Sequence, residues 1–149
     1  MMLGSNRGAS VRIFDAAIEA LPRLGVAVCQ VSPRRLTRPV GASGRRRYLN
    51  CAVVGETELL PQTLMRRLLR LERELGRRRH GRQRRKLPRT LDVDLLACGK
   101  LSLHMPTLTL PHPRLAGRRF VLQALVDVDP KLRLHGCEYS VRKLLRRLG

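Results

Sequence analysis

Two carboxylates lie two residues apart in residues 89–94, which read Arg-Thr-Leu-Asp-Val-Asp. The apolar residues around them predict an extended strand. Side chains alternate between the two faces of a strand, so Asp92 and Asp94 share one face and Val93 lies on the other. Adjacent carboxylates repel each other unless a cation lies between them, and Mg²⁺ often binds one or two protein carboxylates together with substrate phosphates. The pair therefore predicts half of a metal–phosphate site. The alternative is an exposed strand face with two solvated Asp residues.

The chain also carries a large positive charge. Lys and Arg number 31 against 11 Asp and Glu, which gives a formal net charge of +20. Such a field attracts nucleic acid, and arginine also binds the phosphates of a nucleotide. With two Tyr, two Phe and no Trp, the chain lacks the aromatic residues on which RNA-binding sheets stack bases. We therefore expect any nucleic-acid binding to be non-specific and electrostatic.

Length and composition predict one globular domain. The chain has 149 residues, 43% of them hydrophobic. No apolar run approaches the roughly 20 residues that span a membrane, and the N-terminus has no signal-peptide pattern. The four cysteines form neither a CxxC motif nor a zinc-ligand group. Because Cys29, Cys51 and Cys98 lie in apolar segments, we expect buried free thiols and a cytoplasmic location.

Helices and strands alternate along the chain without the spacing of repeated βαβ units. Apolar periodicity predicts helices near residues 14–21, 61–76 and 141–148, and another that starts at Phe120. In the second helix, Glu72 borders the apolar stripe and Glu74 lies on the polar side. Strands are predicted over 26–31, 48–54 and the Asp-bearing segment, with a short extended piece at 108–110 and a loop over 34–47. We expect an α+β fold with a mostly antiparallel sheet.

Several short segments follow one another in a family-like order. The most specific is Arg-Thr-Leu-Asp-Val-Asp, followed by Leu-Pro-His at 110–112. The others are Gly4-Ser5-Asn6, Pro39-Val40-Gly41, Tyr48-Leu49-Asn50, Glu72, Gly76-Arg77 and Arg118-Arg119-Phe120. To about Pro130 this order resembles the 6-hydroxymethyl-7,8-dihydropterin pyrophosphokinases of folate biosynthesis. The resemblance implies a ferredoxin-like αβα sandwich. It also implies transfer of pyrophosphate from ATP to the pterin hydroxymethyl group, with release of AMP.

The resemblance also assigns roles to individual residues. It implies that Asp92 and Asp94 bind two Mg²⁺ ions together with ATP. The catalytic residues that it implies are Asp92, Asp94, Arg77 and Arg89. The implied pterin-binding residues are Tyr48, Asn50, Phe120, Val40 and Gly41. The implied ATP-binding residues are Arg79, Arg89, His112, Arg118, Thr109 and Glu72. The basic run over 77–86 resembles the family's catalytic loop, which closes over bound ATP.

Two of the departures from the family pattern concern the N-terminus and the catalytic loop. Met1, Met2 and Leu3 alone precede Gly4, so we expect a shortened first strand. We expect residues 1–149 to form a single pyrophosphokinase domain. Lys86 and Leu87 stand where the family places a Trp and a Gly before Pro-Arg. The alternatives are therefore a weakly active or inactive family member, or a basic nucleic-acid-binding module. For the enzyme we expect a monomer that binds ATP and 6-hydroxymethyl-7,8-dihydropterin, with no membrane association.

Overall fold

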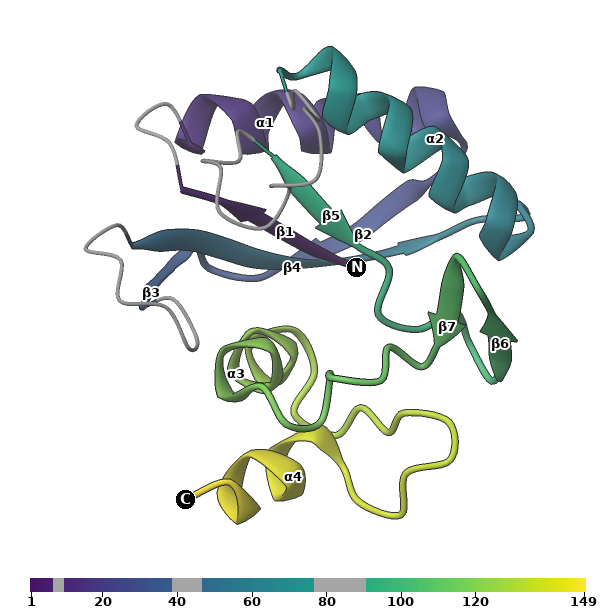
Figure 1. The fold of residues 1–149 in the computed structure, drawn as a ribbon. Helices are drawn as coiled ribbons and strands as arrows, with labels where there is room; N and C mark the ends of the chain where they lie inside the picture. Colours follow the sequence, from purple (N-terminus) through teal and green to yellow (C-terminus); the bar gives the residue numbers. More distant parts are fainter. Residues whose placement is uncertain (7–9, 39–46, 77–90) are drawn as a thin grey trace.

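A computed structural model describes residues 1–6, 10–38, 47–76 and 91–149. Its strands are β1 (Met2–Ser5), β2 (Ala27–Val31), β3 (Arg35–Thr37), β4 (Tyr48–Glu56), β5 (Asp92–Asp94), β6 (Leu103–Met105) and β7 (Leu108–Leu110). Its helices are α1 (Ser10–Ala20), the 3-10 turn η1 (Pro22–Leu24), α2 (Pro61–Glu74), α3 (Arg119–Val128) and α4 (Val141–Arg147). Figure 1 shows α1 and α2 on one face of the main sheet and α3 and α4 on the other. The predicted α+β class with antiparallel strands is confirmed.

The main sheet has the order β2-β4-β1-β5, and β3 also pairs with β4. The long strand β4 pairs with β1 on one side and with β2 and β3 on the other, always antiparallel. Although β1 has four residues, it is central, because Leu3 pairs with Cys51 of β4 and with Val93 of β5. A short central strand thus holds the two acidic residues of β5 in register with the rest of the sheet.

The pairing of β1 with β4 ends at Met1 and Val53, whereas β4 continues to Glu56. Val53 donates its N–H to the Met1 carbonyl at 2.9 Å, and the Met1 amino group donates to the Val53 carbonyl at 2.8 Å. Beside the last residues of β4 lies a cavity of about 550 Å³, lined mainly by apolar side chains from both helical layers. This cavity lies at the end of β1 opposite to Gly4 and Ser5.

Alternation along the strands divides the apolar side chains between two cores. Leu3, Cys51 and Val93 are buried against the α1–α2 layer. Met2, Ala52 and Leu96 are buried against the α3–α4 layer. A fully buried Leu, Val or Met side chain contributes about 1.5–3 kcal/mol to stability. Both faces of the sheet are therefore covered, as in an αβα sandwich.

Helix α2 follows its predicted pattern. Leu64, Leu68 and Leu71 form its apolar stripe and are buried in the core between α2 and the sheet. Glu72 borders this stripe and is 1% exposed. Glu74 lies on the exposed side and pairs with Arg70 at 3.0 Å. Within the described residues, no helix is long and apolar enough to cross a membrane.

Two local expectations were wrong, and one strand was not predicted. Residues 35–37 form β3 inside the predicted loop, because an exposed edge strand needs backbone pairing with β4 rather than an apolar face. Residues 103–105 form β6, which makes a hairpin with the predicted piece at 108–110. Cys29 is exposed, because β2 is an edge strand. Cys51 is a buried free thiol, and burial raises its pKa to about 11, so it stays protonated at neutral pH.

Candidate active site

The two carboxylates of β5 lie on the sheet face that α3 covers. Val93 between them is 1% exposed and belongs to the opposite core. Asp94 pairs in register with Met2, which packs on the α3 side, so Asp92 and Asp94 project toward that side as well. Both are partly buried. The predicted strand and its shared acidic face are thus present.

Gly4 separates Asp92 from a buried amide on the same face. Gly4 pairs with Asp92 on one side and with Asn50 on the other, so the three residues form one row across the sheet. A Cβ atom at Gly4 would lie 3.3 Å from Asn50 Oδ1 and 3.9 Å from Asp92 Cβ. The absence of a side chain at Gly4 therefore keeps open a slot between an amide and a carboxylate.

The amide of Asn50 is held by its neighbours. Its Nδ2 donates to Thr37 Oγ1 at 2.7 Å and to the Tyr48 carbonyl at 3.3 Å. These bonds orient Oδ1 toward Gly4. Tyr48 lies two residues before Asn50 on β4, so its half-buried ring projects from the same face. The side of the slot formed by β4 thus carries an aromatic ring and an oriented amide.

The N-terminus of α3 provides the facing side. Arg118 precedes the helix, and its Nη1 lies 3.9 Å from Asp94 Oδ2. Its guanidinium also lies 5.9 Å from the centre of the Phe120 ring. One arginine is thus shared between a carboxylate and an aromatic ring. This places positive charge and a flat apolar surface opposite the acidic strand.

A groove of about 680 Å³ runs between β3 and the start of α3. It is lined by Arg34, Arg35, Leu36, Thr37, Arg38, Gly117, Arg118, Arg119, Phe120 and Gln123. A bidentate ion pair joins Arg35 to Asp127 of α3, at 2.7 and 2.9 Å, and holds the two walls together. This hydrogen bonding lowers the pKa of Asp127 below its ordinary 3.8, against a smaller opposing effect of burial. Five of the ten residues that line the groove are arginines, so the groove is basic.

His112 follows the cis peptide bond between Leu110 and Pro111. Its backbone N–H donates to the Leu96 carbonyl at 2.8 Å, and its Nδ1 accepts the Arg114 N–H at 3.2 Å. Burial lowers the pKa of His112 below 6.5, although Asp94 raises it. The imidazole is therefore neutral at pH 7 with its proton on Nε2, which can donate to a phosphate oxygen.

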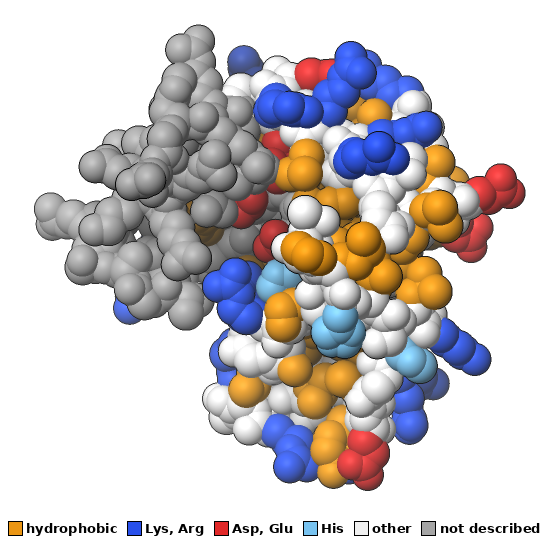
Figure 2. All heavy atoms as spheres, turned by 45° about the vertical axis from the view of Figure 1, so that its right-hand side comes forward, with side chains coloured by type: hydrophobic (Ala, Val, Ile, Leu, Met, Phe, Trp, Pro, Cys, Tyr) orange, Lys and Arg blue, Asp and Glu red, His pale blue; other side chains and the backbone are white. Residues whose placement is uncertain are grey.

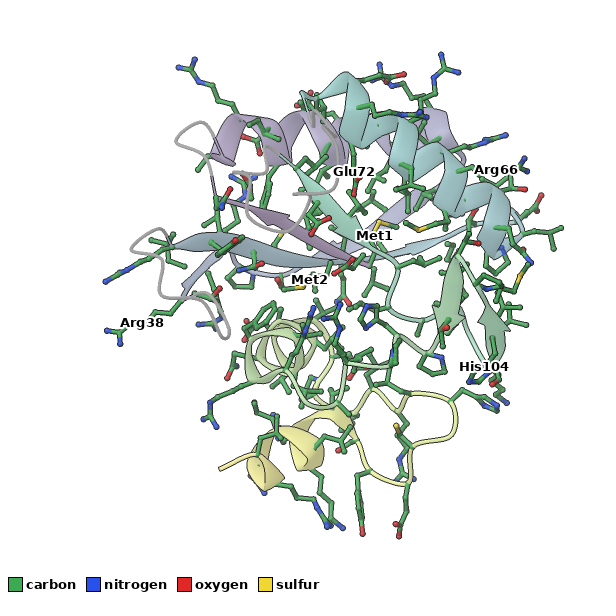
Figure 3. The ribbon with its side chains drawn as sticks, viewed as in Figure 1. Met1, Met2, Arg38, Arg66, Glu72 and His104 are labelled. Carbon is green, nitrogen blue, oxygen red and sulfur yellow. The ribbon has the colours of Figure 1, made fainter. Side chains whose placement is uncertain are left out.

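Two further predicted residues come from different elements. Thr109 is half-buried on β7, between the buried Leu108 and Leu110. Glu72 lies between α2 and β5 (Figure 3), and its Oε1 accepts the Val93 N–H at 2.8 Å. Glu72 thus reaches the backbone between the two aspartates from the opposite face of the sheet. Val40, Gly41, Arg77, Arg79 and Arg89 lie outside the described residues.

Three residues of this region are not marked as site residues by any local sequence pattern. Gly4 belongs to the Gly4-Ser5-Asn6 motif, but its place in the slot depends on pairing with β4 and β5. Thr37 and Arg35 lie on β3, which was expected to be a loop. Their contacts join residues 13 and 92 positions apart in the chain, so no local pattern marks them.

Residues 1–130 match the family described as 7,8-dihydro-6-hydroxymethylpterin-pyrophosphokinase (HPPK). The chain is 40% identical over 129 residues to the mitochondrial folate synthesis bifunctional protein of Arabidopsis thaliana. The aligned region covers 85% of this chain and 22% of that protein. It is 38% identical to a 2-amino-4-hydroxy-6-hydroxymethyldihydropteridine pyrophosphokinase of Pseudomonas aeruginosa, over 89% of this chain and 80% of that protein. A protein of the same name from Methylorubrum extorquens is 36% identical, over 98% and 90%. The chain thus spans about a quarter of the plant bifunctional proteins and most of the bacterial ones.

Proposed function

This chain belongs to the 7,8-dihydro-6-hydroxymethylpterin-pyrophosphokinase family, and from this premise we propose that it acts in folate synthesis. It transfers the pyrophosphoryl group of ATP to the hydroxymethyl group of 6-hydroxymethyl-7,8-dihydropterin. The hydroxymethyl oxygen attacks the β-phosphorus and releases its proton, the bond from the β-phosphorus to the oxygen of the α-phosphate breaks, and AMP leaves. The observation that carries the proposal is the row Asn50–Gly4–Asp92, with Asp94 and Arg118 beside it.

The donor set suits Mg²⁺. Asp92 and Asp94 offer carboxylates on one sheet face, and no group of three His, Cys, Asp or Glu able to hold a metal occurs in the part of the chain that the structure describes. Mg²⁺ favours such sites, because it binds one or two carboxylates and completes its coordination with water and phosphate oxygens. We propose that the pair holds two Mg²⁺ ions together with ATP. The bound metal neutralises the phosphate chain and makes the β-phosphorus more electrophilic.

The pterin ring is proposed to bind in the slot at Gly4. Tyr48 and Phe120 supply flat surfaces from the sheet and from α3, and Val40 and Gly41 complete this set. Oδ1 of Asn50 accepts an N–H from the polar edge of the pterin, since its Nδ2 already donates to Thr37. This arrangement binds a planar heterocycle with its hydroxymethyl group near Asp92.

The phosphates of ATP are proposed to bind on the basic side of the site. Arg118 supplies a guanidinium and His112 a neutral Nε2–H. The other proposed contacts are Thr109, Arg79 and the catalytic Arg77 and Arg89, and Glu72 is proposed to support this ATP site indirectly, through its bond to the Val93 N–H. Arginine suits this role because its planar fork pairs with two phosphate oxygens at once. Together these groups orient ATP for in-line attack and stabilise the charge that moves to AMP.

Several wider expectations remain proposals. We propose that residues 1–149 form one domain, that the protein acts as a cytoplasmic monomer, and that nucleic acid binds only by non-specific electrostatics. Sedimentation of the purified chain over a range of concentrations tests the monomer. A concentration-dependent increase in mass would contradict it.

The experiment that tests the function is AMP formation from ATP and Mg²⁺, with and without 6-hydroxymethyl-7,8-dihydropterin. We expect pterin-dependent AMP, and its loss in Asp92→Asn and Asp94→Asn, which keep side-chain size but remove the negative charge. Asp129→Asn is the matched control, because Asp129 is exposed and bonds locally to the Lys131 N–H. If folded protein gave no AMP, the inactive-relative alternative would replace the proposal.

A further inference from the structure

The segment over residues 131–149 lies beyond the part of the chain that matches the family. It carries six cationic side chains and one acidic side chain, Glu138. The cationic residues are Lys131, Arg133, Arg142, Lys143, Arg146 and Arg147. We call the outer surface formed by these residues the C-terminal basic face. The proposed transfer chemistry assigns it no role.

The C-terminal basic face is built on a fixed support. Val141 is fully buried in the core on the α3–α4 side of the sheet, and the partly buried Leu144 and Leu145 pack against the same core. The apolar side of α4 therefore lies against α3. Arg119 of α3 donates to the Gly149 carbonyl at 2.5 Å, and this bond holds the end of the segment against α3. Arg142, Arg146 and Arg147 are consequently exposed on the opposite side of α4. Figure 1 shows this helix on the far side of α3 from the sheet.

The cations of this face have few competing partners. Within the residues that the structure describes, none of the six forms an ion pair with a carboxylate. Lys143 and Arg147 instead lie 4.0 and 4.6 Å from the centre of the Tyr139 ring. No carboxylate of the described residues neutralises the six cations, so they can attract an external anion.

The arginines of α2 form a natural contrast. They also lie on an outer surface, and Figure 2 shows Lys and Arg side chains over both helical layers. Arg70, however, pairs with Glu74 at 3.0 Å. Arg66 donates to Thr63 Oγ1 at 3.2 Å, and Arg67 donates to the Leu24 carbonyl at 2.9 Å. Positive charge is thus present at both ends of the molecule, but at α2 much of it is engaged within the protein.

We propose that the C-terminal basic face binds the phosphate backbone of nucleic acid without reading its sequence. A phosphate chain fits because it presents several negative charges to a group of cations that have no carboxylate partner among the described residues. A membrane surface fits less well, because the apolar side of α4 is already buried and cannot insert. Base stacking on Tyr139 would compete with the two cations that already lie over its ring. The surface therefore recognises charge and not bases.

The salt dependence of binding tests the proposal. Fluorescence anisotropy would measure the affinity of the whole chain for a labelled oligo-dT over a series of salt concentrations. The variant Arg142→Gln/Arg146→Gln/Arg147→Gln is compared with Arg66→Gln/Arg67→Gln/Arg70→Gln, which loses the same charge from the engaged arginines of α2. Each phosphate contact contributes about 0.7 to the slope of log K against log salt for a single strand. We expect the first variant to lower the magnitude of the slope by about 2, and the second to keep the parent slope.

Three outcomes would overturn the proposal. Equal losses in the two variants would mean that net charge alone attracts the oligonucleotide. An unchanged slope in the α4 variant would place binding elsewhere. Loss of binding to anionic phospholipid vesicles, without loss of oligo-dT binding, would assign the face to a membrane. Pterin-dependent AMP formation should persist in both variants, and the binding result stands whether or not the parent chain transfers pyrophosphate.

Discussion

Replacing Glu72 with leucine should loosen the strand that carries the two aspartates. β5 is an edge strand, and its Val93 N–H bonds to Glu72 of α2 rather than to another strand. Leucine has no acceptor, and a buried N–H without a partner costs about 1–3 kcal/mol. Removal of a buried carboxylate returns part of its desolvation cost. We therefore expect the free energy of unfolding of Glu72→Leu to fall by about 1 kcal/mol.

The same change should weaken metal binding, because Val93 lies between the proposed ligands. Groups that orient metal ligands typically alter metal affinity by about 10–100-fold. Urea unfolding would measure stability, and Mg²⁺ titration of AMP formation would measure metal binding. We expect the Mg²⁺ concentration for half-maximal rate to rise roughly tenfold. Glu72→Gln keeps an amide oxygen as acceptor and should lie close to the parent in both assays.

Glu74→Leu is the control for this prediction. Glu74 lies on the same helix, but its carboxylate is exposed and pairs with Arg70, an interaction worth about 0.2–0.5 kcal/mol. If Glu72→Leu matched Glu74→Leu in both urea midpoint and Mg²⁺ requirement, the support of β5 by Glu72 would be refuted. A large loss in Glu72→Gln equal to that in Glu72→Leu would show that the charge, and not the acceptor, is what matters.

Three further perturbations address other contacts. Gly4→Ala places a methyl group 3.3 Å from Asn50 Oδ1, so steady-state kinetics should show a higher KM for the pterin with little change for ATP; equal increases would contradict a slot specific to the pterin. His112→Ala removes a donor to a charged oxygen, worth about 1.5–3 kcal/mol, so KM for ATP should rise at least tenfold, and His112→Gln should recover part of the loss; unchanged kinetics in both would exclude the contact. Asp127→Asn breaks the bidentate pair with Arg35, which is worth up to about 1 kcal/mol. The pKa of Asp127 is lowered in the folded state, so its stabilisation is present above pH 3.8 and fades as the pH falls below that value. Urea midpoints of parent and variant should therefore differ at pH 7 and approach each other as the pH falls below 3.8, whereas a constant difference would contradict the role of the pair.

The sequence was most informative where burial imposes a strict period. Alternation placed Asp92 and Asp94 on one face of β5 and Val93 in the opposite core. The apolar stripe of α2 likewise predicted that Glu72 would border the core and that Glu74 would be exposed. These features depend on neighbours within one element, so a single segment of sequence contains the information.

Edge strands and long-range contacts could not be predicted in this way. β3 has an exposed Leu36, at 63%, and its position comes from pairing with β4, which local periodicity does not encode. Cys29 is exposed because β2 is the edge strand of the sheet, a position that depends on its pairing with β4. The ion pair between Arg35 and Asp127 joins residues 92 positions apart. Such contacts emerge only when the layers pack together.

The central claim is that the pterin oxygen attacks the β-phosphorus of ATP. The most direct test uses ATP radiolabelled in its β-phosphate, with Mg²⁺ and 6-hydroxymethyl-7,8-dihydropterin, followed by separation of the products. Pyrophosphoryl transfer predicts that the label moves to the pterin and that the AMP formed is unlabelled. Label retained in ADP would mean transfer of the γ-phosphate alone, and label in free pyrophosphate would mean hydrolysis. Either of these results would contradict the mechanism.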